Sequence, residues 1–364
     1  MRVNVFAPFP PLRSGIAIYS EDLATAMQRA GVDVRRVNPS FWRTWRFEVP
    51  VRERSRTVRG LERLRTLALA AAYPEPFSDE DTVNHFHVSG NLFTYFLLRH
   101  FDRVRGRRVI TVHDRHFVTL NRRTPVNEPD QLRMLRDCDL VLVHTEELRS
   151  ALGFVNRNVE IVPHGVDLQR FDLDQAAAKA RLGLSGPVIS HLGFVFNHKG
   201  IEILLKAAMR LDATVLIVGS GPFEGEIRRL AGILCPGKTV LRPYASDEDY
   251  ARSVAASDVV VLPRWSTQGE CSGVMVQSMA AGRAIVAHDM GCFREYLGPD
   301  RGVLTTPGNI TEFTEALESL LKSPELRARY GAASLAFARD NLAWDRVAEQ
   351  HSALFAACLA PTGT

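Results

Sequence analysis

One loop and the helix after it carry the residues best suited to chemistry. The stretch 266–282 holds a carboxylate, Glu270, then a Ser-Gly-Val turn and a side-chain amide, Gln277. A glycine-containing turn that opens a helix has unbonded backbone N–H groups, which bind phosphate. We expect Glu270 to accept hydrogen bonds from sugar hydroxyls, and Gln277 to bind a ribose diol, since an amide both donates and accepts. The residues expected to line this ligand are Glu270, Cys271, Ser272, Gly273, Val274 and Gln277.

A lysine beside a tight turn is the second candidate for binding phosphate. Lys199 and Gly200 follow a predicted strand that runs into Gly193, and they open the next helix. A lysine in this place can pair with a diphosphate as a point charge, although ordinary exposed turns show the same pattern. We therefore predict that Gly193 and Lys199 belong to the same site as the loop 266–282.

The turn Gly219-Ser220-Gly221-Pro222 ends another predicted strand. A nucleobase or ribose can lie against the backbone of Gly219 and Gly221, because glycine permits close approach. Arg242 and Tyr244 fall in the same layer and can contact the base through their backbone. The alternative interpretation is a simple turn between a strand and a helix.

The N-terminal half has two further candidates, both at strand ends. Gly15 lies between the first predicted strand and a helix, where a ligand can reach the backbone and the helix N-terminus. No Gly-x-Gly-x-x-Gly is present, so a dinucleotide site is not predicted. His113 directly follows the predicted strand Arg108–Val112, and open parallel sheets bind their ligands at that edge.

The spacing of histidines and cysteines predicts neither a metal site nor a disulfide. His85 and His87 share one face of a strand, but no third ligand accompanies them. The five cysteines are odd in number and contain no Cys-x-x-Cys. We therefore expect no metal and no resident cofactor.

Apolar, β-branched runs alternate with helical patterns along the whole chain. Near-continuous runs of Val, Ile and Leu indicate strands covered on both faces, and hence parallel sheets flanked by helices. The expected strands are Val3–Ala7, Val32–Val37, Thr82–Phe86, Arg108–Val112, Leu140–Thr145, Val159–Val162, Val188–Leu192, Thr214–Val218, Thr239–Arg242, Val259–Leu262, Ala284–Ala287 and Gly302–Leu304. The expected helices are Ile18–Ala30, Asn91–Phe101, Thr145–Leu152, Ile201–Leu211, Glu224–Leu234, Asp247–Ala256, Val274–Ala281 and Thr311–Leu321. The predicted fold class is α/β, with two Rossmann-like doubly wound domains.

Length and composition fit two soluble domains. The chain has 364 residues, of which 46% are hydrophobic and 24% charged. We place the domains at 1–165 and 166–340, followed by a C-terminal helix over 341–364. No apolar run approaches the roughly 18 residues that span a bilayer, and the first residues do not resemble a signal peptide. We therefore expect a cytoplasmic protein.

The net charge of +4 is unevenly distributed. The segment 35–65 contains ten arginines interleaved with two phenylalanines and two tryptophans. Such a segment suits an anionic membrane surface, which would place the protein peripherally at the inner membrane face, or an acidic acceptor. We do not expect nucleic acid as a partner. The alternative interpretation is a solvated connection within the first domain.

In their order and spacing, these stretches resemble the family 4 retaining glycosyltransferases. The resemblance covers essentially the whole chain and rests on the stretches 14–15, 112–114, 162–167, 199–200, 219–222 and 270–282. It implies the GT-B fold, with two domains facing a central cleft and the final helix crossing back to the N-terminal domain. The first domain would hold the acceptor and the second the nucleotide-sugar donor. By the same resemblance Lys199 pairs with the diphosphate, Glu270 contacts the donor sugar and His113 lies near the reacting sugar.

Three departures from the family pattern affect the expected donor site. Phe194 stands where an arginine often supplies a second cation, so Lys199 acts alone or Arg264 substitutes. Gln277 replaces the second acidic residue, which grips the ribose. The separation of Glu270 from Gln277 is one residue shorter than usual, so that Gly269 takes the first acidic position if the helix sets the register.

The sequence thus predicts a metal-independent, retaining hexosyltransferase that uses a nucleotide sugar as co-substrate. A UDP-sugar is the first choice of donor and GDP-mannose the second. The acceptor is a carbohydrate, a lipid-linked molecule or a small natural product. The alternatives are a GT-B epimerase or phosphorylase, and a degenerate GT-B protein that binds nucleotide or a partner without catalysis.

Overall fold

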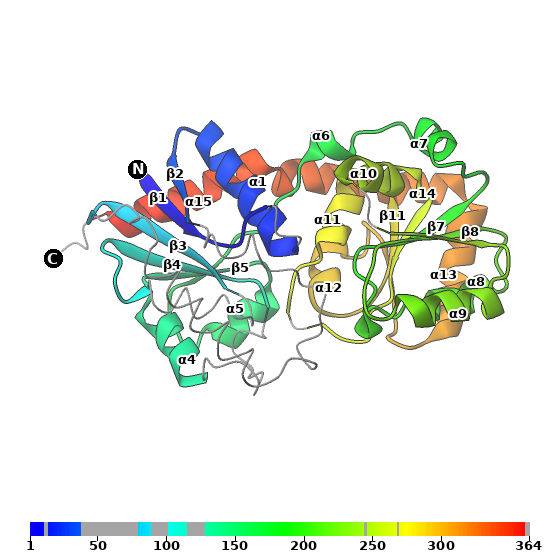
Figure 1. Cartoon of the computed structure of the whole chain (residues 1–364), viewed down its shortest axis with the longest axis horizontal. Helices are drawn as coiled ribbons and strands as arrows, with labels where there is room; N and C mark the ends of the chain where they lie inside the picture. Colours follow the sequence, from blue (N-terminus) through cyan, green and yellow to red (C-terminus); the bar gives the residue numbers. More distant parts are fainter. Residues whose placement is uncertain are drawn as a thin grey trace, which may run out of the picture. The chain divides into compact units, whose positions relative to one another are not determined.

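The chain divides into two compact units, each built around its own sheet. The computed structural model describes residues 1–10, 14–37, 79–88, 101–114, 128–243, 246–267 and 269–360 (Figure 1). The first unit comprises Met1–Val162 together with Val347–Thr364, and the second comprises Pro163–Arg346. The chain therefore leaves the first unit after Val162 and returns to it within its last helix.

The first unit contains a parallel sheet with the strand order β2-β1-β3-β4-β5-β6 among the described residues. Its strands are β1 (Arg2–Phe6), β2 (Asp33–Val37), β3 (Thr82–Val88), β4 (Arg107–Val112), β5 (Leu140–Val143) and β6 (Val159–Ile161). The strands predicted for this half are confirmed, with ends that differ by one or two residues. Because all strands run in one direction, the residues that follow β3, β4 and β5 share one edge of the sheet.

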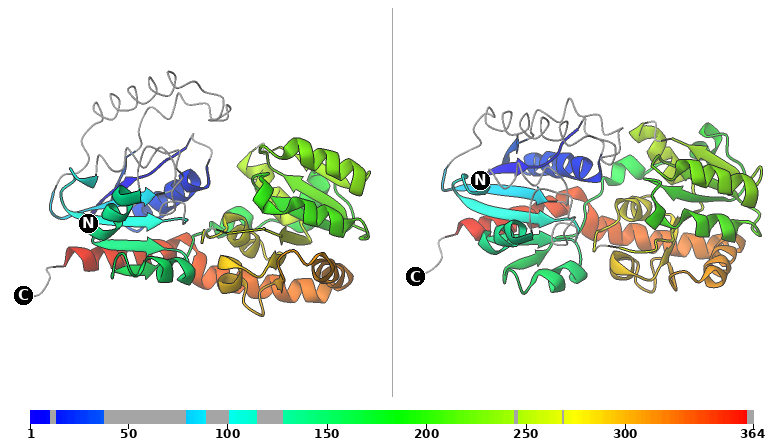
Figure 2. Two further views of the ribbon diagram at one scale, coloured as in Figure 1. Left: turned by 90° about the horizontal axis from the view of Figure 1, so that it is seen from below. Right: turned by 60° about the horizontal axis from the view of Figure 1, so that its bottom comes forward.

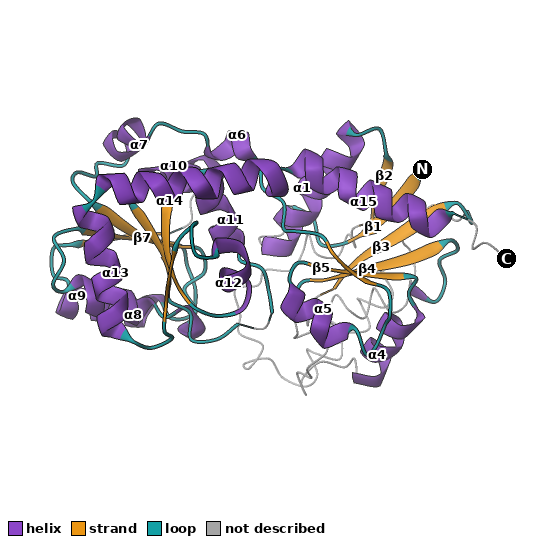
Figure 3. Cartoon of the chain, turned by 180° about the vertical axis from the view of Figure 1, so that it is seen from behind, coloured by secondary structure: helices purple, strands orange, loops and turns teal. Residues whose placement is uncertain are grey.

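Helices flank the first sheet (Figure 3). They include α1 (Gly15–Arg29), α4 (Glu128–Asp137), α5 (Glu146–Leu152) and α15 (Trp344–Leu359). The side chain of Ser14 caps α1 by accepting from the N–H of Ala17, and Thr145 caps α5 in the same way. The ring of Phe355 packs edge-on against His85 of β3, so the last part of α15 lies beside this sheet (Figure 2).

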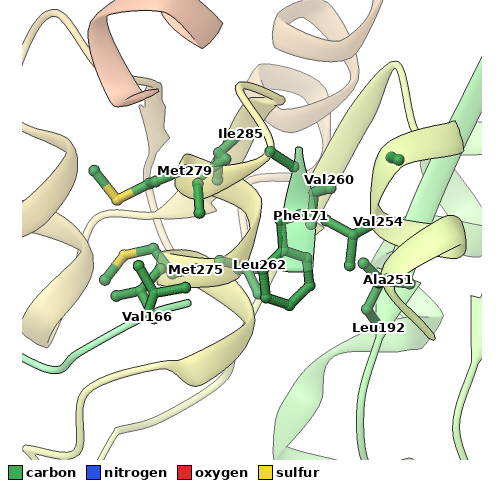
Figure 4. Packing of buried hydrophobic residues seen from close by; sticks show 14 of the residues in the cluster. Val166, Phe171, Leu192, Ala251, Val254, Val260, Leu262, Met275, Met279 and Ile285 are labelled. Atoms are coloured by element: carbon green, nitrogen blue, oxygen red, sulfur yellow. The ribbon is translucent and has the colours of Figure 1, made fainter. Parts of the chain in front are cut away.

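The second unit contains a parallel sheet with the strand order β12-β11-β10-β7-β8-β9. Its strands are β7 (Val188–Leu192), β8 (Thr214–Val218), β9 (Thr239–Arg242), β10 (Val259–Leu262), β11 (Ala284–His288) and β12 (Val303–Thr305). Successive residues of one strand enter different cores. Val260 belongs to the cluster that includes Leu192 and Met275 (Figure 4). Val259 belongs to the cluster of Leu204 and Phe313. This two-sided burial is the reason that the strands read as unbroken apolar runs.

The helices of the second unit alternate with its strands. They are α6 (Leu168–Phe171), α7 (Gln175–Arg181), α8 (Ile201–Ala208), α9 (Glu224–Leu234), α10 (Asp247–Ala256), α11 (Gly273–Ala280), α12 (Gly291–Leu297), α13 (Ile310–Lys322) and α14 (Pro324–Phe337). The short helix α12 and, in the first unit, α4 were not predicted. A π-helical stretch, Ala338–Leu342, joins α14 to the region of α15.

Two expectations fall partly or wholly outside the described residues. The arginine-rich segment is described only at its start, where Arg36 of β2 forms an ion pair with Glu21 of α1. Most of the helix predicted over 91–101 also lies outside the described residues. Among the described helices, none has the combination of length and apolar character required to cross a membrane.

Candidate functional site

Lys199 lies at the end of a short 3₁₀ turn, Asn197–Lys199, that follows β7. The next residue, Gly200, has φ = 67°, and a Cβ there would lie 1.8 Å from the carbonyl oxygen of Pro263. Only glycine therefore lets this turn approach the end of β10. Burial, reinforced by the charge of Arg264, lowers the pKa of the half-buried Lys199 ammonium to about 7.

The turns after β7 and β8 pack directly on one another. The carbonyl oxygen of Gly193 would lie 1.8 Å from a Cβ on Gly219, and that of Val195 would lie 2.3 Å from a Cβ on Gly221. The N–H of Gly219 also donates to the carbonyl of Arg242, which ends β9. The structure thus brings together at one sheet edge the backbone of Gly193, Gly219, Gly221 and Arg242. Tyr244 lies outside the described residues.

Arg264 follows β10 and is almost fully buried, with 5% of its surface exposed. Its Nη1 donates to Oε1 of Glu270 at 2.5 Å, and its Nη2 donates to Oγ of Ser272 at 3.1 Å. Its guanidinium also lies over the ring of Phe293, 5.2 Å from the centroid. Arg264 is therefore a fixed cation beside the loop 266–282, and it forms an ion pair with Glu270 of that loop.

From the sequence, Glu270 was expected to accept hydrogen bonds from sugar hydroxyls. In the structure one of its carboxylate oxygens already accepts a hydrogen bond from Arg264. Gly269, which stands eight residues before Gln277, has φ = 78°. That backbone conformation favours glycine and would strain a glutamate. The loop therefore carries its carboxylate one residue later than the usual family spacing, and points it at Arg264.

The loop then opens α11. The Oγ of Ser272 caps the helix by accepting from the N–H of Met275, while Gly273 and Val274 are half-buried at its first turn. Gln277 lies one turn further, where its Oε1 accepts from the hydroxyl of Tyr250 at 2.8 Å. Tyr250 thus fixes the amide of Gln277 so that its Nε2 is the end left to donate to a ligand.

Cys271 follows Glu270 in the loop, and its thiol lies beside that of Cys292. Burial and the neighbouring Cys292 thiol raise the pKa of Cys271 well above its ordinary value. The hydroxyl of Tyr296 lies beside the same thiol and accepts from the backbone N–H of His164 at 3.1 Å. Thiols in this state are inert, so Cys271 contributes shape and not a nucleophile.

In the first unit His113 directly follows β4 and is buried. Its Nε2 lies 3.1 Å from Nδ1 of His87, and its Nδ1 lies 3.1 Å from Nε2 of His144. Both ring nitrogens of His113 are therefore engaged by other histidines. Gly15 begins α1, and a Cβ added there would meet no atom of the described residues within 4 Å.

The candidate site of the second unit can bind an anion, but within the described residues nothing indicates a metal. Lys199, Arg264 and the amides of the turn before α11 supply positive potential. No group of three or more His, Cys, Asp or Glu side chains in the described part of the chain is placed to hold a metal ion.

The sequence did not indicate Tyr250 and Tyr296, because neither belongs to a recognisable motif.

Solved structures of the same architecture define the class of fold. Sucrose-phosphate synthase from Thermosynechococcus elongatus superposes with a TM-score of 0.77 at 19% identity, covering 100% of both chains. Anabaena Alr3699/HepE in complex with UDP-glucose superposes with a TM-score of 0.74 at 15% identity, covering 98% of this chain and 100% of that chain. With a six-stranded parallel sheet in the described part of each unit, the protein has the GT-B fold predicted from the sequence.

Family models match both halves of the chain. The model "Glycosyltransferase Family 4" covers residues 13–170 and the model "Glycosyl transferases group 1" covers residues 186–323. The chain belongs to the family 4, group 1 glycosyltransferases, as the motifs predicted.

Curated relatives match over part of their length. The GDP-mannose-dependent monoacylated alpha-(1-6)-phosphatidylinositol monomannoside mannosyltransferase of Corynebacterium glutamicum is 30% identical over 218 residues, 56% of this chain and 57% of that protein. Alpha-D-kanosaminyltransferase of Streptomyces kanamyceticus is 26% identical over 67% of this chain and 69% of that protein. The match therefore spans little more than half of the first of these relatives.

Proposed function

We propose that the protein transfers a hexosyl group from a nucleotide sugar to an acceptor hydroxyl, with retention at the anomeric carbon and without a metal ion. The observation that carries this proposal is the set of cations and amides at one sheet edge of the second unit. Lys199, Arg264 and the turn before α11 converge on the loop that the family uses for its donor diphosphate. The leaving diphosphate gains negative charge in the transition state, and fixed positive groups stabilise that charge.

Each donor residue has a separate part in this proposal. Lys199 pairs with the diphosphate, and the amides of Ser272, Gly273 and Val274 bind its oxygens. Arg264 supplies the second cation in place of the arginine that Phe194 replaces, and Glu270 orients Arg264 through their ion pair. Gln277 donates its Nε2 to the ribose. The backbone of the turn 219–221 and the end of β9 border the base.

The proposed donor is a uridine or guanosine diphosphate sugar. The mannosyltransferase of Corynebacterium glutamicum is named as GDP-mannose-dependent, and HepE was solved with UDP-glucose. The proposed acceptor is a carbohydrate, a lipid-linked molecule or a small natural product, bound by the first unit. Front-face attack, in which the departing phosphate takes the acceptor proton, needs no protein nucleophile.

A panel of nucleotides and nucleotide sugars tests the proposed function. We expect UDP or GDP, and its sugar, to raise the Tm of the protein, because a ligand at 100 times its Kd stabilises the native state by about 2.7 kcal/mol. The same nucleotide sugar, incubated with glycan and lipid-linked acceptors, should yield a glycosylated product. Absence of any thermal shift would contradict the donor site. Conversion of the nucleotide sugar alone would identify an epimerase, and binding without any product would identify a non-catalytic protein.

The lowered pKa of Lys199 predicts that nucleotide binding depends on pH. Above about pH 7 a growing fraction of Lys199 is neutral in the free protein, whereas a bound diphosphate favours the ammonium. Binding must then include uptake of a proton, so Kd for UDP or GDP should rise about tenfold per pH unit above pH 7. Titration calorimetry at pH 7.5 and 8.5 measures this change. Lys199→Arg, which stays charged, is the control and should flatten the profile; equal Kd values for the native protein would contradict the prediction.

A further inference from the structure

Three buried histidines form a hydrogen-bonded row along the carboxyl edge of the first sheet. The row runs from His144, after β5, through His113, after β4, to His87 of β3. It begins at the carbonyl oxygen of Val162, which lies 2.8 Å from Nδ1 of His144. The family motif includes His113 alone, so the two neighbours are unexplained by the proposed donor site.

The carbonyl at one end gives this row a direction. A carbonyl oxygen only accepts, so Nδ1 of His144 carries a proton. In a neutral imidazole the other nitrogen then only accepts, and Nε2 of His144 must receive the proton of Nδ1 of His113. The same step repeats once more: Nε2 of His113 accepts from Nδ1 of His87. One backbone carbonyl therefore dictates the tautomer of all three rings.

The surroundings of the row favour neutral rings. His87, His113 and His144 have exposed fractions of 1%, 8% and 2%, and burial disfavours the charged form of an imidazole. The ring of Tyr19 from α1 lies against all three, with centroid separations of 4.9 to 5.6 Å. At the far end, Nε2 of His87 is buried and has no hydrogen-bond partner among the described residues. With the proton of His87 on Nδ1, its Nε2 carries a lone pair at this end of the row.

We propose that His144 and His87 are positioning residues that hold His113 in a single tautomer, with its proton on Nδ1, at the edge of the acceptor unit. The row ends at the carbonyl oxygen of Val162, which cannot accept and release a proton. The row therefore orients His113 and does not transfer protons. A substrate hydroxyl that bonds to the His113 ring can donate to Nε2 only by displacing His87. The kinetic consequence rests on the proposed transferase function, whereas the tautomer does not.

Nitrogen-15 NMR of the full chain, labelled at histidine, tests the tautomer directly. Long-range proton–nitrogen correlation at pH 7.5 distinguishes the Nδ1–H form from the Nε2–H form and from the charged ring. We expect His87, His113 and His144 all in the Nδ1–H form, with each signal assigned by a single His→Gln substitution. An Nε2–H or charged His113 would overturn the proposal, and this outcome does not depend on any activity.

A pair of matched variants tests the positioning role. His144→Phe removes the acceptor of His113, which should lose its exclusive Nδ1–H form. His351→Phe is the control, since His351 is equally buried in this unit, beside His85 but outside the row. If the transferase function holds, His144→Phe should lower kcat about tenfold to a hundredfold at an unchanged KM for the nucleotide sugar, and His351→Phe should not.

The outcomes separate the two proposals. An unchanged His113 signal in a folded His144→Phe variant would overturn the positioning role. If that variant does not fold, the spectrum of the native protein still decides the tautomer. A native protein without transferase activity but with all three rings in the Nδ1–H form would refute the proposed function and leave the directed row standing.

Discussion

Lys199→Ala should lower kcat about a thousandfold. Removal of one preorganised donor from a developing anion costs roughly 10² to 10³ in rate, and an ammonium at a diphosphate lies at the upper end because its hydrogen bonds are charge-assisted. The Tm should stay the same or rise, since the native state no longer buries an amine near Arg264. Steady-state kinetics with the nucleotide sugar found in the panel, together with thermal unfolding, measure both effects.

Lys206→Ala is the matched control for this variant. Lys206 is an exposed lysine near the end of α8, the helix that follows the Lys199 turn. Lys206→Ala removes the same positive charge as Lys199→Ala, but from an exposed position outside the proposed donor site. Its kcat and KM should therefore remain normal. Near-normal turnover in Lys199→Ala, or an equal loss in Lys206→Ala, would remove Lys199 from the proposed diphosphate site.

Acidification should unfold the protein well before its carboxylates are neutralised. Burial lowers the pKa of His164 and His351 to about 4 and of His191 to about 3, and with neighbouring histidines it holds the pKa of His85 and His87 well below the ordinary value. Below about pH 6.5 the unfolded chain binds protons that the native state does not. Stability therefore falls as the pH falls, by up to about 1.4 kcal/mol per pH unit for each histidine.

These contributions accumulate over a narrow range of pH. Five histidines together give a slope of up to about 7 kcal/mol per pH unit, against a usual domain stability of roughly 5–15 kcal/mol. Urea unfolding followed by circular dichroism from pH 8 to pH 5 measures this slope. His351→Gln should reduce the slope by about 1.4 kcal/mol per pH unit, whatever its own effect on stability. A free energy of unfolding that is constant between pH 7 and pH 5 would contradict the assignment of these rings as neutral in the native state.

The fold was predictable from the sequence because its strands are buried on both faces. β8 and β10, for example, consist almost entirely of Val, Ile and Leu, and both were placed at their observed bounds. The two helices that were missed have weak signals. α12 has seven residues, begins at a glycine and is followed by another, and the described side chains of α4 bury little beyond Met134 and Leu135. Neither length nor periodicity identifies such elements.

The candidate site was predictable only as far as its local motifs. Lys199 and the turn before α11 were recognisable because chain neighbours form them. The partners that decide what the side chains can do come from elsewhere: Tyr250 is 27 residues from Gln277, and His144 is 31 residues from His113. A single sequence carries no signal for such pairs, so the engagement of Gln277 and of both nitrogens of His113 appears only in the structure.

The return of α15 to the first unit has a practical consequence for dividing this protein into its two units. His351 and Phe355 complete the packing around His85, although nearly two hundred residues of the other unit separate them from β6 in the chain. A fragment cut after Val162 would lack part of its own interior. Producing the first unit alone thus requires a circular permutation, or the terminal helix added back as a peptide. C-terminal tags or truncations that disturb this helix also act on the first unit.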